Sequence, residues 1–356
     1  MRCCLDLGGG VDGIWAMVAF ALRKSLLLLA LFLTASALLF TASRLTLGDG
    51  VLLAQKAPDP ERAAQIEAEL GLDLPWPAQY VNYLGNFLQG EWGASILNQR
   101  SVADEVKNRL PATLELSLTA LALGVVIGVG TTLLAELAPW QWARRLPEAL
   151  GALGLTVPIF WLGLLFIIVG AAWLNWFPVS GRFDYILERP EGTGFLVIDS
   201  LAAGDWEALG STLHHLALPA LCLSFFPAAM VSGLLRARIQ EPRWQRLLVA
   251  LRAKGLSPTA IWLRHGLRLL GAPLIIVLGT SFGLLLGGSV LTETVFAWPG
   301  MGRYLVGAVL DRDVFIIQYA LLLVMFLIFA VVWLTELLAV ALNPRLAQPG
   351  EGDDAH

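Results

Sequence analysis

Two features that decide the fold lie in one stretch, residues 216–268: LALPALCLSFFPAAMVSGLLRARIQEPRWQRLLVALRAKGLSPTAIWLRHGLR. Residues 216–235 carry no charge and have the length, roughly 20 residues, that a helix needs to cross about 30 Å of hydrocarbon. The loop that follows, from Arg236 to Arg268, holds eight basic residues against the single acid Glu241. Because basic residues in short loops stay on the cytoplasmic side, the stretch predicts a membrane span followed by a cytoplasmic loop.

The composition of the whole chain agrees with a membrane protein. Of the 356 residues, 57% are apolar and only 15% are charged, which is too hydrophobic for an ordinary soluble domain. The net charge of -4 gives no nucleic-acid footprint. The three cysteines, Cys3, Cys4 and Cys222, offer neither a disulfide framework nor spaced metal ligands. We therefore expect no nucleic acid, no metal and no cofactor.

Similar apolar runs recur along the chain and predict an all-α membrane protein with six transmembrane helices. The length of the first run and its lack of a cleavage site indicate a retained span rather than a signal peptide. Met17 precedes a short basic lead-in to this run, so it is an alternative start to Met1. The six predicted spans lie at about residues 25–43, 113–135, 150–174, 216–235, 273–291 and 316–342.

The loops between these spans give the orientation. Arg144 and Arg145 place the loop after the second span in the cytoplasm, and an acidic segment after the third span suits the outside. An even number of spans puts both termini in the cytoplasm. A polar stretch between the first two spans contains a helix-like segment at 59–70 and an aromatic one at 76–92. We divide the chain into an N-terminal extension (1–18), a first helix with its outer segment (19–110), a core of five spans (111–345) and a tail (346–356).

Glycines at every fourth position indicate close helix packing within or between chains. Gly124 and Gly128 lie on one face of the second span, and Gly279, Gly283 and Gly287 on one face of the fifth. Prolines interrupt the third and fourth spans, where neighbouring helices or water must compensate for the lost backbone bonds. These prolines are Pro158, Pro219 and Pro227.

The sequence lacks the chemistry of an enzyme or of a self-powered pump. None of its four lysines lies in a phosphate-binding loop, so ATP hydrolysis would need another chain. Signatures of metalloproteases and α/β-hydrolases are absent. The adjacent His214 and His215 point in different directions on a helix, which favours a structural role over a metal site. Carboxylates within the spans lie near span ends, which weakens an ion-coupled mechanism without excluding it. They are Glu115, Glu136, Glu293 and Glu336.

The basic loop itself has an internal plan. Residues 244–254 read as a short helix, Gly255 as a break, and Ser257–Pro258 as the cap and first turn of a second helix. Helix, glycine turn and helix would make a protruding knob that could transmit force from a soluble partner. The alternative is that its basic residues only keep the loop on the cytoplasmic side and bind no partner.

The loop resembles the EAA coupling loop of ATP-binding-cassette importer permeases of the dipeptide, oligopeptide and nickel family. The loop departs from that motif at Val249, where the family has glutamate, and at Leu251, where it has alanine; near the C-terminus, Asn343 replaces the usual aspartate. The matching stretches, in the family's order, are Arg109–Leu116, Phe160–Gly163, Phe177–Gly181, Val249–Ser257, Leu263–Arg268, Gly287–Gly288, Glu293–Gly302 and Asn343–Arg345.

The resemblance implies a permease subunit in a bacterial inner membrane that imports peptides. It implies a second homologous permease, two ATPase subunits and an extracytoplasmic binding protein as partners, together with the lipid bilayer. Nickel or another small solute remains an alternative cargo, and an ion-coupled transporter or a membrane-bound scaffold or enzyme an alternative class. By resemblance the ATPase-coupling residues are Ala250, Arg252, Ala253, Lys254, Gly255 and Leu256. The outer-face or pathway candidates are Glu293, Phe296, Trp298, Pro299 and Gly300. The segment 76–92 is a further candidate for this role, and membrane-interface anchoring by Trp76 and Trp92 is the alternative.

Overall fold

The computed structural model describes residues 12–47, 61, 74–261 and 267–343, and within these ranges every regular element is a helix. Five helices are long and apolar enough to cross a membrane, and a bent helix pair makes a sixth span if its two limbs count as one. The predicted all-α architecture is therefore confirmed. The predicted helix at 59–70 falls almost wholly outside the described residues. The five long helices are α1 (Asp12–Leu47), α5 (Val102–Leu137), α9 (Trp206–Gln240), α12 (Leu267–Val295) and α14 (Val314–Leu342).

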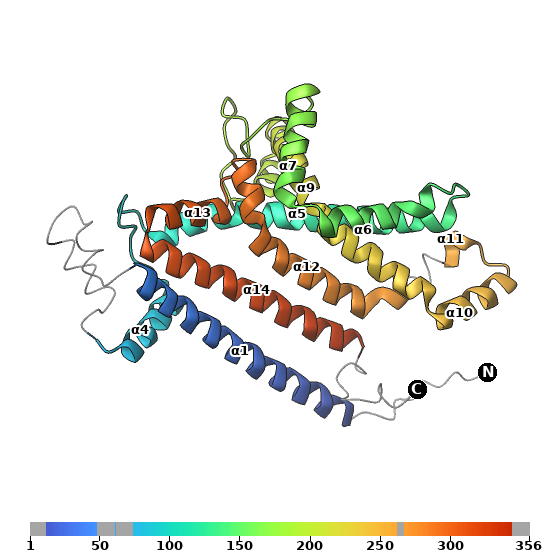
Figure 1. Ribbon diagram of the computed structural model, residues 1–356, viewed down its shortest axis with the longest axis horizontal. Coiled ribbons are helices and arrows are strands. Elements are labelled where there is room, and N and C mark those ends of the chain that lie inside the picture. Colours follow the sequence, from blue (N-terminus) through green and yellow to red (C-terminus); the bar gives the residue numbers. More distant parts are fainter. Residues whose placement is uncertain (1–11, 48–60, 62–73, 262–266, 344–356) are drawn as a thin grey trace.

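The third predicted span, at about 150–174, is the bent pair; the pair begins earlier, at Ala143, and is broken between Thr156 and Ile159. A 3-10 turn, η1 (Ala143–Arg145), and α6 (Leu146–Thr156) form one limb, and α7 (Ile159–Phe166) with the π-helix η2 (Ile167–Trp173) the other. The helix axis bends by 108° between the limbs, and α7 rises out of the bundle in Figure 1. The corner lies at Pro158, which lacks an N–H and excludes the preceding residue from helical backbone. Val157 is accordingly extended, with φ -83° and ψ 128°.

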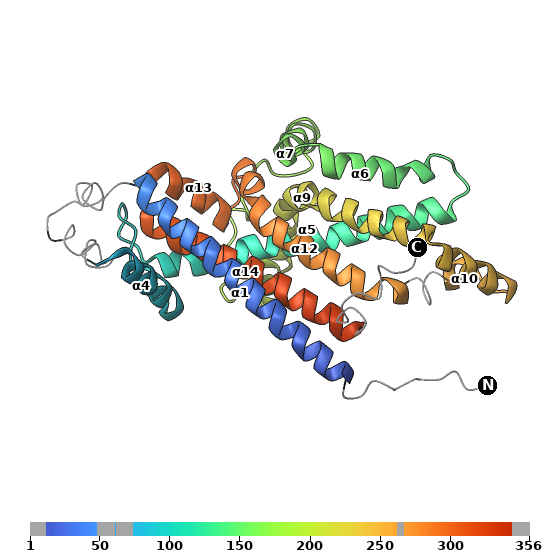
Figure 2. The same ribbon diagram turned by 60° about the horizontal axis from the view of Figure 1, so that its bottom comes forward.

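Short helices and the two ends of the bundle complete the fold. The basic-loop helices, α10 and α11, lie at one end of the long axis, and α4 and α13 lie at the other (Figures 1 and 2). The first residues of α1 and the last of α14 point toward the end that carries α10. The short helices are α4 (Trp76–Gln89), α8 (Leu196–Ala203), α10 (Pro242–Ala253), α11 (Pro258–Ile261) and α13 (Met301–Asp311).

Polar residues that precede the apolar runs cap the N-termini of three of the long helices. Ser101 caps α5 by accepting a hydrogen bond from the N–H of Asp104 at 3.3 Å. Asp205 caps α9 by accepting from two backbone N–H groups, and Asp313 caps α14. Side-chain oxygens at these positions satisfy N–H groups that have no partner within the helix.

Helix α9 occupies the centre of the bundle, where it packs on α5, α6 and α12. The approach to α5 is close because Gly124 and Gly128 face it. A methyl carbon at Gly128 would lie 2.7 Å from the carbonyl oxygen of Ala228, and one at Gly124 would lie 2.6 Å from Cγ of Pro227. The two helices therefore pack backbone against backbone.

The glycine ladder of α12 faces α14 within the same chain. A methyl carbon at Gly279 would collide with the side chain of Thr335, and one at Gly283 would contact Ile328 at 3.4 Å. The third glycine, Gly287, is more open, since a methyl carbon there would meet only Ile328 at 4.0 Å. Contact along this ladder fixes how closely α12 and α14 approach.

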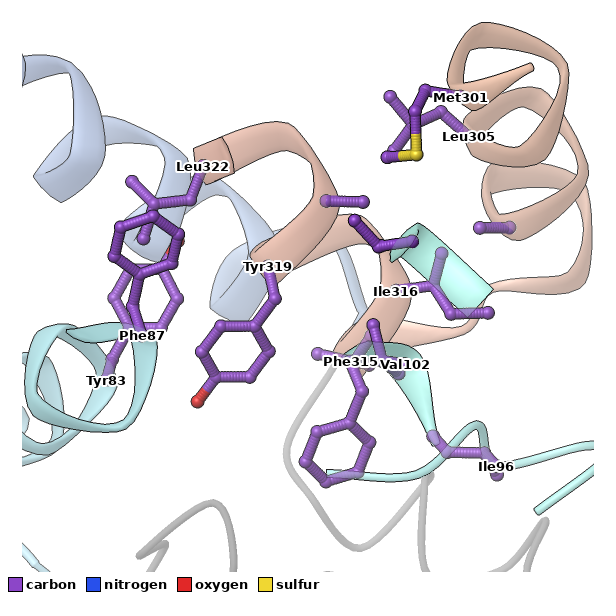
Figure 3. Packing of buried hydrophobic residues seen from close by; sticks show 14 of the residues in the cluster. Tyr83, Phe87, Ile96, Val102, Met301, Leu305, Phe315, Ile316, Tyr319 and Leu322 are labelled. Atoms are coloured by element: carbon purple, nitrogen blue, oxygen red, sulfur yellow. The ribbon is translucent and has the colours of Figure 1, made fainter. Parts of the chain in front are cut away.

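The largest hydrophobic cluster joins α4, α13 and the start of α14 at the end remote from α10. Figure 3 shows Tyr83 and Phe87 of α4 beside Tyr319 and Leu322 of α14. The hydroxyl of Tyr83 donates to the carbonyl of Gln318 at 3.1 Å. This cluster holds the aromatic segment 76–92 against the bundle.

Candidate functional site

The basic loop folds as the predicted knob. One face of α10 is apolar and packs inward: Trp244, Leu248 and Leu251 cluster with Ile261 of α11 and with Ile239, near the end of α9. The knob is therefore held by its own small core at the end of α9, so that a push on α10 would be transmitted to a spanning helix.

Gly255 makes the turn between the two helices. Its φ of +79° lies in the left-handed region, which side chains other than glycine and asparagine rarely adopt. Its N–H donates to Arg252 O at 2.9 Å, and the N–H of Leu256 donates to Leu251 O at 3.3 Å, which closes the C-terminus of α10. Ser257 then caps α11 by accepting from Ala260 N at 3.3 Å, as predicted.

The outward face of the knob consists of the residues that the resemblance assigns to coupling. Ala250, Arg252, Ala253, Lys254 and Gly255 are exposed, and Leu256 is half-buried. The exposed residues lie apart from the cluster that holds the opposite face of α10, whereas Leu256 packs against that cluster.

The two departures from the coupling motif have different structural consequences. Val249 is 69% exposed, so valine there changes the surface of the knob and not its core. Leu251 is 7% exposed and belongs to the core of the knob. A leucine in place of alanine thus adds buried apolar volume.

At the other end of the molecule Glu293 is wholly buried and organises the turn after α12. Its carboxylate accepts from the Thr113 hydroxyl at 2.6 Å, from the N–H of Arg303 at 3.0 Å and from the Ser289 hydroxyl at 3.3 Å. The Thr113 oxygen in turn accepts from the N–H of Met301 at 2.8 Å. A buried carboxylate with several donors is stable where an unpaired one would not be, so Glu293 fastens the 293–303 segment to α5.

The other outer-face candidates separate into buried and exposed residues. Phe296 and Trp298 lie in the interior, and the indole N–H of Trp298 donates to Ala112 O at 3.0 Å. Gly300 is buried too, and Pro299 is exposed. Of the five candidates, Pro299 is the one whose side chain reaches the surface of this chain.

A buried ion pair that the sequence did not indicate lies beside this turn. Arg182 donates to Oε2 of Glu115 through Nη2 at 2.6 Å and through Nε at 3.2 Å, and both side chains are about 5% exposed. The guanidinium also lies 5.7 Å from the ring centroid of Trp298. Sequence reasoning treated Arg182 as one charge in an outer loop, because nothing in a separation of 67 residues points to a pair.

The loop beyond Arg182 is braced by Asp199 of α8. Its carboxylate accepts from the N–H and the hydroxyl of Thr193 and from the N–H of Gly194, each at 2.8 Å. Burial alone would raise the pKa of Asp199, but these hydrogen bonds outweigh it and hold the pKa below its usual value. The loop thus keeps a defined shape next to the first turns of α5.

Two cavities open on this end of the molecule, about 690 and 360 Å³ in volume. Arg109 and Pro299 line both and separate them. Arg109 is fixed by Glu105, which accepts from it at 2.8 Å, and by the ring of Tyr304, whose centroid is 4.5 Å away. The exposed Pro299 therefore stands between two polar hollows.

Three further polar residues of the spans have structural contacts. His214 bonds to Trp176 O at 2.6 Å and His215 to Ser211 O at 2.8 Å, with their rings 80° apart. Glu336 pairs with Lys24 of α1 at 3.0 Å. Within the described ranges no three His, Cys, Asp or Glu side chains gather as metal ligands would.

Comparisons with known proteins agree on one family. Residues 124–348 match the family described as binding-protein-dependent transport system inner membrane component, and residues 17–118 match its N-terminal region. The chain is 35% identical over 332 residues to the di/tripeptide transport system permease protein DppB of Pseudomonas aeruginosa, covering 93% of this chain and 99% of that protein. It is 33% identical over 335 residues, with the same coverage, to the dipeptide transport system permease protein DppB of Escherichia coli K12.

A solved chain of the MetNI methionine ABC transporter in an inward-facing conformation also overlaps with the fold. The match has a TM-score of 0.47 and 16% identity, and it covers 76% of this chain and all of that one.

Proposed function

This chain belongs to the binding-protein-dependent transport system inner membrane components, as a permease subunit of an ATP-binding-cassette importer, and from that premise we propose that it imports short peptides. Family membership makes it a multi-pass membrane protein that works with ATPase and substrate-binding components. The peptide cargo is supported by the relatives, which are permeases of di/tripeptide and dipeptide transport systems.

The observation that best supports the mechanism is the knob formed by α10 and α11, in which Gly255 makes the turn. Ala250 and the segment 252–256 dock in a groove of an ATPase subunit, with Arg252 and Lys254 beside the turn. When two ATPase subunits close around ATP, they push α10, and the small core under it transmits the movement to α9. In this way one chain that lacks a nucleotide site is driven by another.

Besides this chain, the assembly contains a second, homologous permease, two ATPase subunits and an extracytoplasmic binding protein. The knob and both termini face the cytoplasm, because the loop carries eight basic residues against one acid. The end with α4, α13 and Pro299 faces the binding protein. The proposed units are an N-terminal extension (1–18), a first helix with its outer segment (19–110), a permease core (111–345) and a cytoplasmic tail (346–356).

Nickel or another small solute is the second candidate cargo, since the family resemblance that the coupling loop carries includes nickel permeases. An ion-coupled transporter has less support because Glu115, Glu293 and Glu336 each have partners within the chain.

The test is reconstitution of the purified importer in liposomes with its binding protein and radiolabelled dialanine. We expect uptake that requires ATP inside, the binding protein outside and all permease and ATPase subunits. Uptake of nickel but not of dialanine would show that the cargo is nickel and not a peptide. Uptake by this chain alone under an ion gradient would overturn the mechanism.

A further inference from the structure

The larger cavity, of about 690 Å³, has the size of a small-molecule site. It lies between the first two turns of α5, the loop 189–194 and Pro299, at the end of the molecule remote from the knob. A peptide delivered by the binding protein would meet this end first under the proposed orientation. The lining is predominantly polar and charged, which indicates a hydrophilic occupant.

One cation in the cavity wall is fixed in position. Arg182 lines the cavity although its side chain is only 4% exposed. Glu115 and the carbonyl of Gly194 hold its Nε and Nη2, and the hydrogen bonds recorded for the described residues leave Nη1 unused. Because this guanidinium is already held in place, binding an anion to it costs little additional side-chain entropy.

Two further charges in the cavity have no ionic partner among the described contacts. Arg189 and Glu191 are both exposed and line the same wall. The other two cations are engaged, Arg109 with Glu105 at 2.8 Å and Lys107 with Asp104 at 3.9 Å. The cavity therefore offers one free cation and one free carboxylate, two residues apart.

The positive charge of Arg189 is near enough to Arg182 to shift the pKa of its guanidinium. Burial lowers the pKa of Arg182, Glu115 opposes this, and the positive charge of Arg189 lowers the pKa further. Two neighbouring cations repel each other, and an anion between them would remove that repulsion. Glu191 lies on the same loop and would repel that anion but attract a cation.

The wall that carries these charges is preorganised. Asp199 holds Thr193 and Gly194 by three hydrogen bonds, and a methyl carbon at Gly192 would lie 2.7 Å from its Oδ1. Arg189 and Glu191 thus project from a loop whose end is anchored.

We propose that this cavity recognises the charged ends of the incoming peptide: Arg189 and Arg182 bind its terminal carboxylate, and Glu191 faces its terminal ammonium. This inference rests on the proposed peptide function. It assigns to the permease a selection for free, zwitterionic peptides that acts after release from the binding protein. The competing occupant is an acidic side chain of the binding protein, and the experiment separates the two.

The experiment uses the complete importer in liposomes, with dialanine, dialanine amide and N-acetyl-dialanine each at concentrations that saturate the binding protein. The amide lacks the carboxylate and the acetylated peptide lacks the ammonium. We expect the wild type to import dialanine about tenfold faster than the amide, which corresponds to about 1.4 kcal/mol and lies near the lower end of what a hydrogen bond to a charged group contributes. Arg189→Gln should lower dialanine uptake about tenfold and leave uptake of the amide unchanged, and Arg189→Lys should restore most of the loss.

Glu191→Gln should give the mirror result, slowing dialanine but not N-acetyl-dialanine. The matched control is Arg312→Asn, which removes an exposed cation between α13 and α14, outside the cavity, and substitutes a residue that tolerates the φ of +56° found there. It should leave the rates of all three peptides unchanged.

Two results would overturn the inference while leaving the peptide function intact. One is dialanine uptake at the wild-type rate by Arg189→Gln. The other is an equal loss for dialanine and its amide, with more binding protein needed for half-maximal ATPase stimulation, which would assign Arg189 to docking. If the wild type imports none of the three peptides, the proposed function fails first and the inference falls with it.

Discussion

At the scale of single residues, Gly255 is the position where the backbone rather than a side chain carries the proposed coupling function. A methyl carbon added there would meet nothing within 4 Å, so a substitution causes no clash inside this chain. Its effect comes from the left-handed φ, which costs roughly 1–2 kcal/mol for most residues. The cost falls on the shape of the turn that would fit the ATPase groove.

We therefore expect Gly255→Val to reach the membrane in normal amounts but to reduce ATP-driven uptake to less than about a tenth, because a β-branched residue disfavours this backbone most. Gly255→Asn should retain much more uptake, since asparagine tolerates positive φ. Binding-protein-stimulated ATPase activity of the reconstituted importer measures both. Normal stimulation in the valine variant would exclude the coupling role.

The sequence predicts a residue's role where that role depends on its neighbours along the chain, and not where it depends on a contact with a distant segment. The helix, the break at Gly255 and the Ser257 cap follow from neighbouring residues and are confirmed. The pairing of Glu115 with Arg182 and the enclosure of Glu293 arise from contacts between distant segments. No local pattern marks them, because the same glutamates are equally compatible with an exposed span end.

At the scale of helices, the positions of the spans followed from hydropathy but their straightness did not. The long helices extend beyond the predicted apolar cores because capped polar turns continue them, as at Ser101 of α5 and Asp205 of α9. The sequence predicts an interruption at Pro158, yet a proline in a span can be accommodated as a mild kink. Here the extended Val157 turns it into a corner.

The contact between α5 and α9 gives a matched test within one helix. Gly128→Ala would push a methyl carbon against the backbone of α9, whereas one at Gly130 meets nothing within 4 Å. We expect Gly128→Ala to destabilise the protein by about 1–3 kcal/mol through overpacking. Gly130→Ala should be neutral or slightly stabilising, because alanine favours helix by about 1 kcal/mol.

Thermal unfolding of the detergent-purified importer, followed by tryptophan fluorescence, measures the difference between these two variants. Equal midpoints would show that the two helices are not in close contact in the assembled protein.

At the scale of the whole molecule, the separation of the knob from the polar cavities predicts which loops are reachable from each side. The loop after η2 exposes Tyr185 at 94%, and the loop after α5 exposes Gln141. In a parent with Cys3 and Cys4 changed to serine, Cys222 remains as a buried thiol.

In this parent, Tyr185→Cys should react with a membrane-impermeant maleimide in intact spheroplasts. Gln141→Cys should react only after permeabilisation. Gel-shift labelling of the two variants measures this, and the reversed pattern would invert the proposed orientation.

The corner at Val157–Pro158 has a consequence for the lipid around the protein. The limb before it has 3 and 11 residues in η1 and α6, and the limb after it has 8 and 7 in α7 and η2. At about 1.5 Å per residue each limb is roughly 20 Å long, short of the roughly 30 Å of hydrocarbon. Since the helix axis bends by 108° between the limbs, their lengths do not add along the membrane normal. A lipid-facing limb of this length would require the bilayer beside it to become thinner.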